Sequence, residues 1–263
     1  MELEQIIEGL LGLYYAVYPE MERIVTNIIL TDDLDRSHRE LRPDLSSQID
    51  EHARESVDYN GRMVLPVSLD ENITVLLNTK KILEYTNDRS MTWVGTFAHE
   101  HTHAIDYYSM ARLEALDSYD PLQQISRYHM FQLWSEYHAR KLGYGFLRKF
   151  LATDDGTISK EERLEHIQNY EWPFHREKHF RDYHADTNGD QQMYITMQLL
   201  GRYAVWCDLF PTEFNENIFA ETYGNTPWMH HLFSFLRQHE TLDAICGNFE
   251  EMKLILSENW CEM

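Results

Sequence analysis

Residues 93–108 read Trp-Val-Gly-Thr-Phe-Ala-His-Glu-His-Thr-His-Ala-Ile-Asp-Tyr-Tyr and contain the pattern H-E-x-x-H. Positions four apart lie on one face of an α-helix, so His99 and His103 can bind the same metal ion. Glu100, beside the first histidine, can take the proton of a water molecule held in the open position of a zinc ion. The stretch therefore predicts a helix that carries a zinc site, with two of the three protein ligands that a catalytic site needs.

Composition excludes several classes of protein. The chain has 263 residues, of which 43% are hydrophobic and 13% aromatic, enough for a sizeable core. Its formal net charge of −21 argues against nucleic acid and against an anionic membrane surface, because both partners require positive charge. Glycine patterns for phosphate or dinucleotide binding and the serine-hydrolase pattern are absent. We therefore expect neither a nucleic-acid partner nor a membrane partner.

The termini and cysteines bear on the cellular setting. The N-terminus is acidic where a signal peptide is basic, and no apolar run approaches the roughly 20 residues that span a bilayer. The three cysteines are widely spaced and form no pattern for disulfides or a thiolate zinc site. These features predict a cytoplasmic protein, whose oligomeric state the sequence does not specify.

Before the motif, apolar periodicity and β-branched runs predict a mixture of helices and strands. The Asn60-Gly61 pair is a strong turn signal and predicts a hairpin. The expected elements are a helix over 3–17, a strand over 23–30, a loop over 32–48, a hairpin of 53–59 and 62–67, a strand over 73–78, and a short helix and loop over 79–88.

From the motif onward the pattern is helical. Ser90 is a plausible N-cap for the motif helix, and Asp120 followed by Pro121 favours the start of the next helix. The expected helices cover 90 to about 116, 121–151, 157–170, 190–209, 228–239 and 240–258. The predicted fold class is thus α+β, with residues 1–263 forming a single catalytic unit. An α/β half (1–116) carries the motif, and a mostly helical half (117–263) follows it.

A third metal ligand is expected downstream of the two histidines. Glu136 shares a helical stripe with the small residues Ala139 and Gly143, which allow close approach to a neighbouring helix. Small residues also flank the motif histidines, at Gly95, Ala98 and Thr102. Two such helices can bring Glu136 to the histidines. His138 is the alternative third ligand.

His99-Glu100-x-x-His103 followed by Glu136-x-x-Ala139 resembles the gluzincin zinc metallopeptidases, in particular compact forms found in bacteria and phages. The resemblance covers residues from Ile73 to about 145. It implies a zincin-like fold, in which the edge strand of a mixed sheet binds an extended peptide, and Ile73–Asn78 stands where that strand is expected. It further implies Zn²⁺ held by His99, His103 and Glu136, Glu100 as general base, and a peptide or protein as substrate.

The sequence departs from the family pattern at Arg140, where gluzincins have an aspartate that orients a zinc histidine. Asp106 can substitute for it, and Arg140 can pair with Asp106 or with Glu136. The family also uses a tyrosine or histidine of its second half to stabilise the developing oxyanion. The candidates here are Tyr144, Tyr183, His184, Tyr203, Tyr223, His230 and His231.

Two other hypotheses about the function remain beside that of a peptidase. One is a catalytically inactive zinc-binding protein on a gluzincin scaffold, with a regulatory or interaction role; the other is a helical structural protein with a chance motif. His101 points away from His99 on a helix and is predicted to be a surface or supporting group. The His175/His179 pair also has the four-residue spacing, and both residues are expected to be surface or locally bonded histidines.

Overall fold

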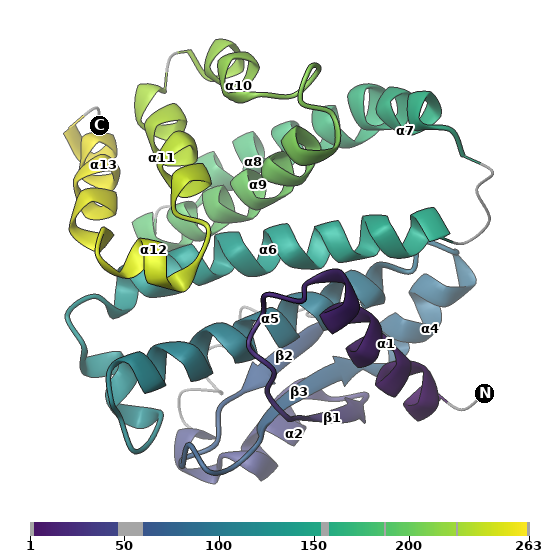
Figure 1. Cartoon of the computed structure of the whole chain (residues 1–263), viewed down its shortest axis with the longest axis vertical. Coiled ribbons are helices and arrows are strands. Elements are labelled where there is room, and N and C mark those ends of the chain that lie inside the picture. Colours follow the sequence, from purple (N-terminus) through teal and green to yellow (C-terminus); the bar gives the residue numbers. More distant parts are fainter. Residues whose placement is uncertain (1–2, 47–59, 154–157, 187, 225, 262–263) are drawn as a thin grey trace. The chain divides into compact units, whose positions relative to one another are not determined.

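The computed structural model describes residues 3–46, 60–153, 158–186, 188–224 and 226–261. The protein is α+β, with many helices and one small mixed sheet (Figure 1). The chain forms two compact units: unit 1 comprises Met1–Gln124 and Leu142–Leu151, and unit 2 comprises Ile125–Lys141 and Ala152–Met263. Helix α6 (Tyr128–Thr153) therefore contributes residues to both units.

The sheet belongs to unit 1 and has the strand order β1 (Thr26–Thr31), β3 (Ile73–Asn78), β2 (Gly61–Val64). β3 runs parallel to β1 and antiparallel to β2. The prediction that Ile73–Asn78 is an edge strand is therefore wrong, because β3 lies between the other two strands (Figure 1). Its nearly continuous apolar sequence, Ile-Thr-Val-Leu-Leu-Asn, is typical of a strand covered on both faces.

The expected hairpin turn at Asn60-Gly61 is also wrong. Gly61 lies in β2 opposite Leu77, and the carbonyl of Asn60 accepts a hydrogen bond from the N–H of Asn78 (2.9 Å). A Cβ added to Gly61 would lie 2.9 Å from Cγ2 of Thr96, so glycine here permits close approach of a helix. The first strand of the expected hairpin, 53–59, lies outside the described residues.

The main core of unit 1 covers one face of the sheet. Val75 and Leu77 of β3 pack there with residues of four helices: α1 (Leu3–Val17), α4 (Thr79–Asn87), α5 (Thr92–Leu113) and the C-terminal part of α6. On the other face lies α2 (Leu34–Leu41), which buries Leu34 against β2 and β3. The loop expected over 32–48 is thus wrong. The segment contains a polar helix whose one buried residue is Leu34, and the side chain of Asp33 caps its N-terminus. The low apolar content of this helix explains why its periodicity did not predict it.

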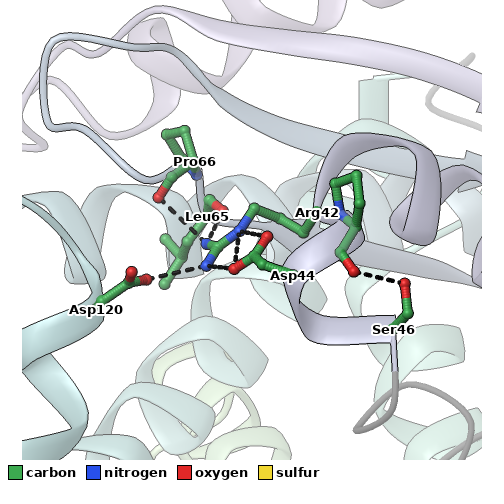
Figure 2. A network of polar contacts seen from close by, with 7 residues as sticks. Arg42, Asp44, Ser46, Leu65, Pro66 and Asp120 are labelled. Carbon is green, nitrogen blue, oxygen red and sulfur yellow. Dashed lines mark hydrogen bonds and ion pairs between the residues drawn. The ribbon is translucent and has the colours of Figure 1, made fainter.

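Arg42, which is 5% exposed, joins three segments of unit 1. Its guanidinium donates to the carboxylates of Asp44 and Asp120 and to the carbonyls of Leu65 and Pro66 (Figure 2). The bonds link η1 (Pro43–Leu45), η2 (Asp120–Gln124) and the β2–β3 connection. Asp120 therefore does not cap the long helix as predicted: its carboxylate binds Arg42, it begins the short η2, and α6 starts only at Tyr128.

Unit 2 contains the first part of α6 and the remaining helices. Its other elements are α7 (Lys160–His166), η3 (Ile167–Glu171), α8 (Trp172–Ala185), α9 (Gly189–Leu209), α10 (Glu216–Thr222), α11 (Pro227–Gln238), α12 (Leu242–Cys246) and α13 (Phe249–Cys261). Tyr203 lies at the centre of its core, with ring contacts to Trp172, Phe219 and Phe233. Among the described helices of the chain, none is long and apolar enough to cross a membrane.

Three predictions for unit 2 need correction. The helix expected to end near 170 continues through the π-helical turn η3 into α8, whose second residue is Pro173. The single helix expected over 240–258 is two helices separated at Gly247. The short α10, which Asn215 caps, was not predicted.

Candidate metal centre

Helix α5 carries the motif and is buried along most of its length. It begins after Met91, whose φ of 52° is left-handed, so the prediction of Ser90 as its N-cap is wrong. Ser90 instead donates its N–H to the carboxylate of Asp88 (2.8 Å). His99 and His103 lie on one face of α5, and their Nε2 atoms are 3.2 Å apart. The i,i+4 spacing has therefore placed the two ring nitrogens as the sequence predicted.

The C-terminal part of α6 approaches α5 without intervening side chains. A Cβ added to Gly143 would lie 2.8 Å from both the carbonyl oxygen of Gly95 and Cβ of His99. The hydroxyl of Tyr18 donates to the carbonyl of Leu142 (2.9 Å) and supports the same contact. Glu136 lies seven residues before Gly143, about two turns earlier on the same helical face. Close packing at the glycine thus brings the C-terminal part of α6 against α5.

Three potential ligands come together as predicted. The ligand atoms of His99, His103 and Glu136 all lie within 4.8 Å of one another. In a tetrahedral zinc site with bonds of 2.0–2.1 Å, ligand atoms are about 3.3 Å apart. The Nε2 atoms of the two imidazoles, 3.2 Å apart, match that separation. The group can hold a divalent metal ion, and two imidazoles with one carboxylate suit several transition metals.

The two residues around Glu136 take different roles. Arg140 pairs with Glu136 (Nη2 to Oε1, 3.4 Å), one of the two partners that the sequence allowed. Glu136 is only 2% exposed, so a positive neighbour offsets part of the cost of burying its charge. His138, the alternative ligand, lies outside the three-residue group, and its ring stacks on Trp134 (4.8 Å between centroids).

Asp106 is buried on α5, three residues after His103. Burial is the main cause that raises the pKa of Tyr14, and the charge of Asp106 adds to it. Tyr14 in turn bonds to Thr102 of the motif helix (2.7 Å). The supporting role that the sequence suggested for Asp106 stays a prediction.

Glu100, the predicted general base, has a partner that sequence analysis missed. Its Oε2 accepts a hydrogen bond from the backbone N–H of Met63 in β2 (2.9 Å). No sequence pattern encodes this contact, because the donor is a main-chain group that every residue except proline carries.

His101 lies in the core of unit 1, not at the surface or beside the metal ligands, so its prediction is wrong. Its ring nitrogens contact the hydroxyls of Tyr15 (3.0 Å) and Thr26 (3.3 Å), and its ring stacks on Phe97. Burial lowers the pKa of His101 to about 4. The neutral imidazole serves as a hydrogen-bonded core residue.

The candidate oxyanion donors are spread over several helices. The hydroxyl of Tyr144 accepts a hydrogen bond from Arg148 (2.6 Å), and that of Tyr203 donates to the carbonyl of Asn215 (3.2 Å). Both hydroxyls thus bond to residues close to them in the sequence. Other candidates make ring contacts: Tyr183 with His184, Tyr223 with Phe219, and His230 with His231.

Comparison of the chain with protein-family models, curated proteins and solved structures finds no match. The functional argument therefore rests on the site itself.

Proposed function

We propose that the protein is a zinc-dependent metallopeptidase with a zincin-like fold of the gluzincin type. The observation that carries the proposal is the convergence of His99, His103 and Glu136 from two helices, with Glu100 next to the first ligand. The chain order of mixed sheet, motif helix and glutamate helix agrees with that assignment.

The ligand set fits zinc. Two neutral imidazoles and one carboxylate leave a bound Zn²⁺ with a net positive charge, and three ligands leave a coordination position open. When bound, zinc supplies a Lewis acid that polarises a carbonyl and lowers the pKa of water. The chain itself supplies the base: the carboxylate of Glu100 accepts a proton and returns it to the leaving amine.

The proposed substrate is a peptide or protein segment in extended conformation. β3 (residues 73–78) is the central strand, so the strand that we propose to lie next to the substrate is β2. The contact between Met63 and Glu100 brings β2 beside the base, whereas β1 lies on the opposite side of β3. An extended peptide can pair with an exposed strand edge through main-chain hydrogen bonds.

The test is metal content and proteolysis of the purified chain. We expect about one zinc per chain, and hydrolysis of fluorescein-labelled casein that falls by at least about 100-fold in Glu100→Gln, because a general base contributes 10²–10⁴-fold. The variant should keep its zinc, since Glu100 is not a ligand. Absence of zinc in protein purified without chelators contradicts the proposal.

The ion pair between Arg140 and Glu136 favours a second candidate, an inactive zinc-binding regulatory or interaction protein. A guanidinium on the ligand carboxylate withdraws negative charge from a bound ion. Under this alternative, Glu100→Gln changes neither proteolysis nor biological output, and His99→Ala abolishes the fold. A large loss of proteolysis in Glu100→Gln decides for the peptidase.

A further inference from the structure

The N–H of Met63 points away from the sheet. The carbonyl of Asn60 bonds to the N–H of Asn78, so these residues form a hydrogen-bonded pair of the β2–β3 ladder. Such pairs alternate along antiparallel strands with non-hydrogen-bonded ones. Met63 stands three positions after Asn60, opposite Val75, and falls in the second class. Its amide therefore lies on the outer side of β2, where Glu100 Oε2 accepts from it.

A second contact fixes the spacing between helix and strand. Thr96 lies four residues before Glu100 on the same face of α5, and Gly61 lies two residues before Met63 on the same face of β2. Thr96 sits so close to Gly61 that a Cβ there would be 2.9 Å from it. The pairs Thr96–Gly61 and Glu100–Met63 thus place one face of the helix along one strand.

The bond to Glu100 is not needed for the sheet. Among the described strands β2 lies at the edge of the sheet, and Met63 makes no bond to β3 with this N–H. An amide on an edge strand can be solvated by water. The side chain of Glu100, by contrast, has three rotatable bonds, and a donor at Oε2 restricts them. The constraint acts on the carboxylate.

We propose that the backbone N–H of Met63 is a positioning group for Glu100, so that strand β2 orients the general base. This inference rests on the proposed function for its catalytic consequence, but the contact itself is testable without turnover. Hydrogen-bonded partners of this kind restrict the orientation of the groups that act at a metal site.

The first experiment measures amide hydrogen exchange by NMR in the full chain. In Glu100→Ala we expect the Met63 amide to exchange at least about tenfold faster, because its acceptor is removed. The amides of Arg62 and Val64, which belong to hydrogen-bonded pairs with β3, should keep their rates. Unchanged exchange at Met63 overturns the proposal, whatever the activity of the protein.

The second experiment removes the donor. Met63→Pro deletes the N–H and keeps the carbonyl groups, and proline is tolerated at a strand edge where no ladder bond is lost. The matched control is Met63→Ala, which changes the side chain and keeps the donor. If the proline variant fails to fold, replacement of the residue-63 amide by an ester removes the same N–H.

The readouts are zinc content, casein hydrolysis, and the affinity of the Co²⁺-substituted protein for acetohydroxamic acid, whose hydroxyl proton a neighbouring carboxylate accepts. We expect kcat and hydroxamate affinity to fall about 10–100-fold in the proline or ester variant, as for lost supporting bonds at metal sites. Zinc content should stay unchanged, and the proline or ester variant should lose at least about tenfold more kcat and hydroxamate affinity than Met63→Ala, which keeps the donor. Equal effects of Met63→Ala and Met63→Pro overturn the proposal. If the zinc-loaded wild type cleaves no casein, the proposed function fails, and exchange and hydroxamate binding still decide the role of Met63.

Discussion

Two helices of this protein carry histidines four residues apart, and their chemistry differs. In α5 the Nε2 atoms of His99 and His103 face each other at 3.2 Å and belong to a three-ligand group with Glu136. In α8 the Nε2 of His179 contacts Oγ1 of Thr196 (3.1 Å), and the ring of His175 lies against Trp206. Thr196 donates its own proton to the carbonyl of Gln192, so it accepts from His179.

The difference shows what helical spacing leaves undecided. A four-residue interval places two imidazoles on one face of a helix. They can then bind a metal ion, but they can equally form hydrogen bonds or ring contacts with a neighbouring helix. The α5 pair becomes a candidate site because its ring nitrogens and the carboxylate of Glu136 form one group of potential ligands. The following predictions test this comparison, in decreasing order of effect.

Removal of a ligand from the α5 pair should have the largest effect. We expect His103→Ala to weaken zinc binding by more than about 100-fold, since a lost direct ligand costs more than a lost supporting bond, which costs 10–100-fold. The matched control is His175→Ala in the α8 pair, which should leave zinc affinity unchanged. Competition with a chromophoric chelator measures both, and an equal loss in the two variants would remove the distinction between the helices.

The contact between Gly143 of α6 and helix α5 should tolerate no side chain. In Gly143→Ala the new Cβ meets backbone atoms of Gly95 and His99 within 2.9 Å, so a helix must shift. We expect a loss of about 2–3 kcal/mol in the free energy of unfolding, typical of overpacking, together with weaker zinc binding. Gly12→Ala, where nothing lies within 4 Å of the added Cβ, is the control and should stabilise α1 by about 0.5–1 kcal/mol. Urea denaturation with normal stability in Gly143→Ala would refute the close contact.

His179 should make stability depend on pH. Burial lowers its pKa from 6.5 to about 4, helped by the charge of His184 and opposed by that of Asp182. The unfolded chain then binds more protons between these values, so stability is fully present above pH 6.5 and falls as the pH drops toward 4. The loss amounts to about 3 kcal/mol at most. The free energies of unfolding of the wild type and His179→Gln, measured at pH 7.5 and 4.5, test this loss. A difference between the two proteins that does not change with pH would contradict a buried neutral imidazole.

The smallest effect concerns the partner of that imidazole. Thr196→Val keeps the shape of the side chain and removes the acceptor for the His179 ring N–H, which leaves a buried donor without its bond. We expect a loss of about 1–3 kcal/mol in the free energy of unfolding, measured by thermal denaturation at pH 7.5. Thr222→Val is a control, because its hydroxyl is exposed and bonds only within its own helix.

Sequence patterns were most informative where structure is local. The motif helix, α1 and β3 follow from periodicity and β-branched content, and Glu136 followed from small residues on its stripe. Prediction failed where a residue with a strong local preference for a turn or a cap makes its main contact with a residue far away in the sequence. Asp120 binds Arg42 and does not cap a long helix, so α6 starts later than predicted. Gly61 lies in β2 close to Thr96 and does not form the predicted turn.

The amino-acid sequence by itself predicted which three residues form the candidate ligand group, because helical periodicity and the sizes of side chains on one face can be read from consecutive residues. Only the tertiary structure decided that β3 is central, that His101 belongs to the core, and that Glu100 bonds to Met63. These features depend on backbone hydrogen bonds and on burial between segments far apart in the chain. Main-chain donors are the same at nearly every position, so no local pattern distinguishes the one that the fold brings to Glu100.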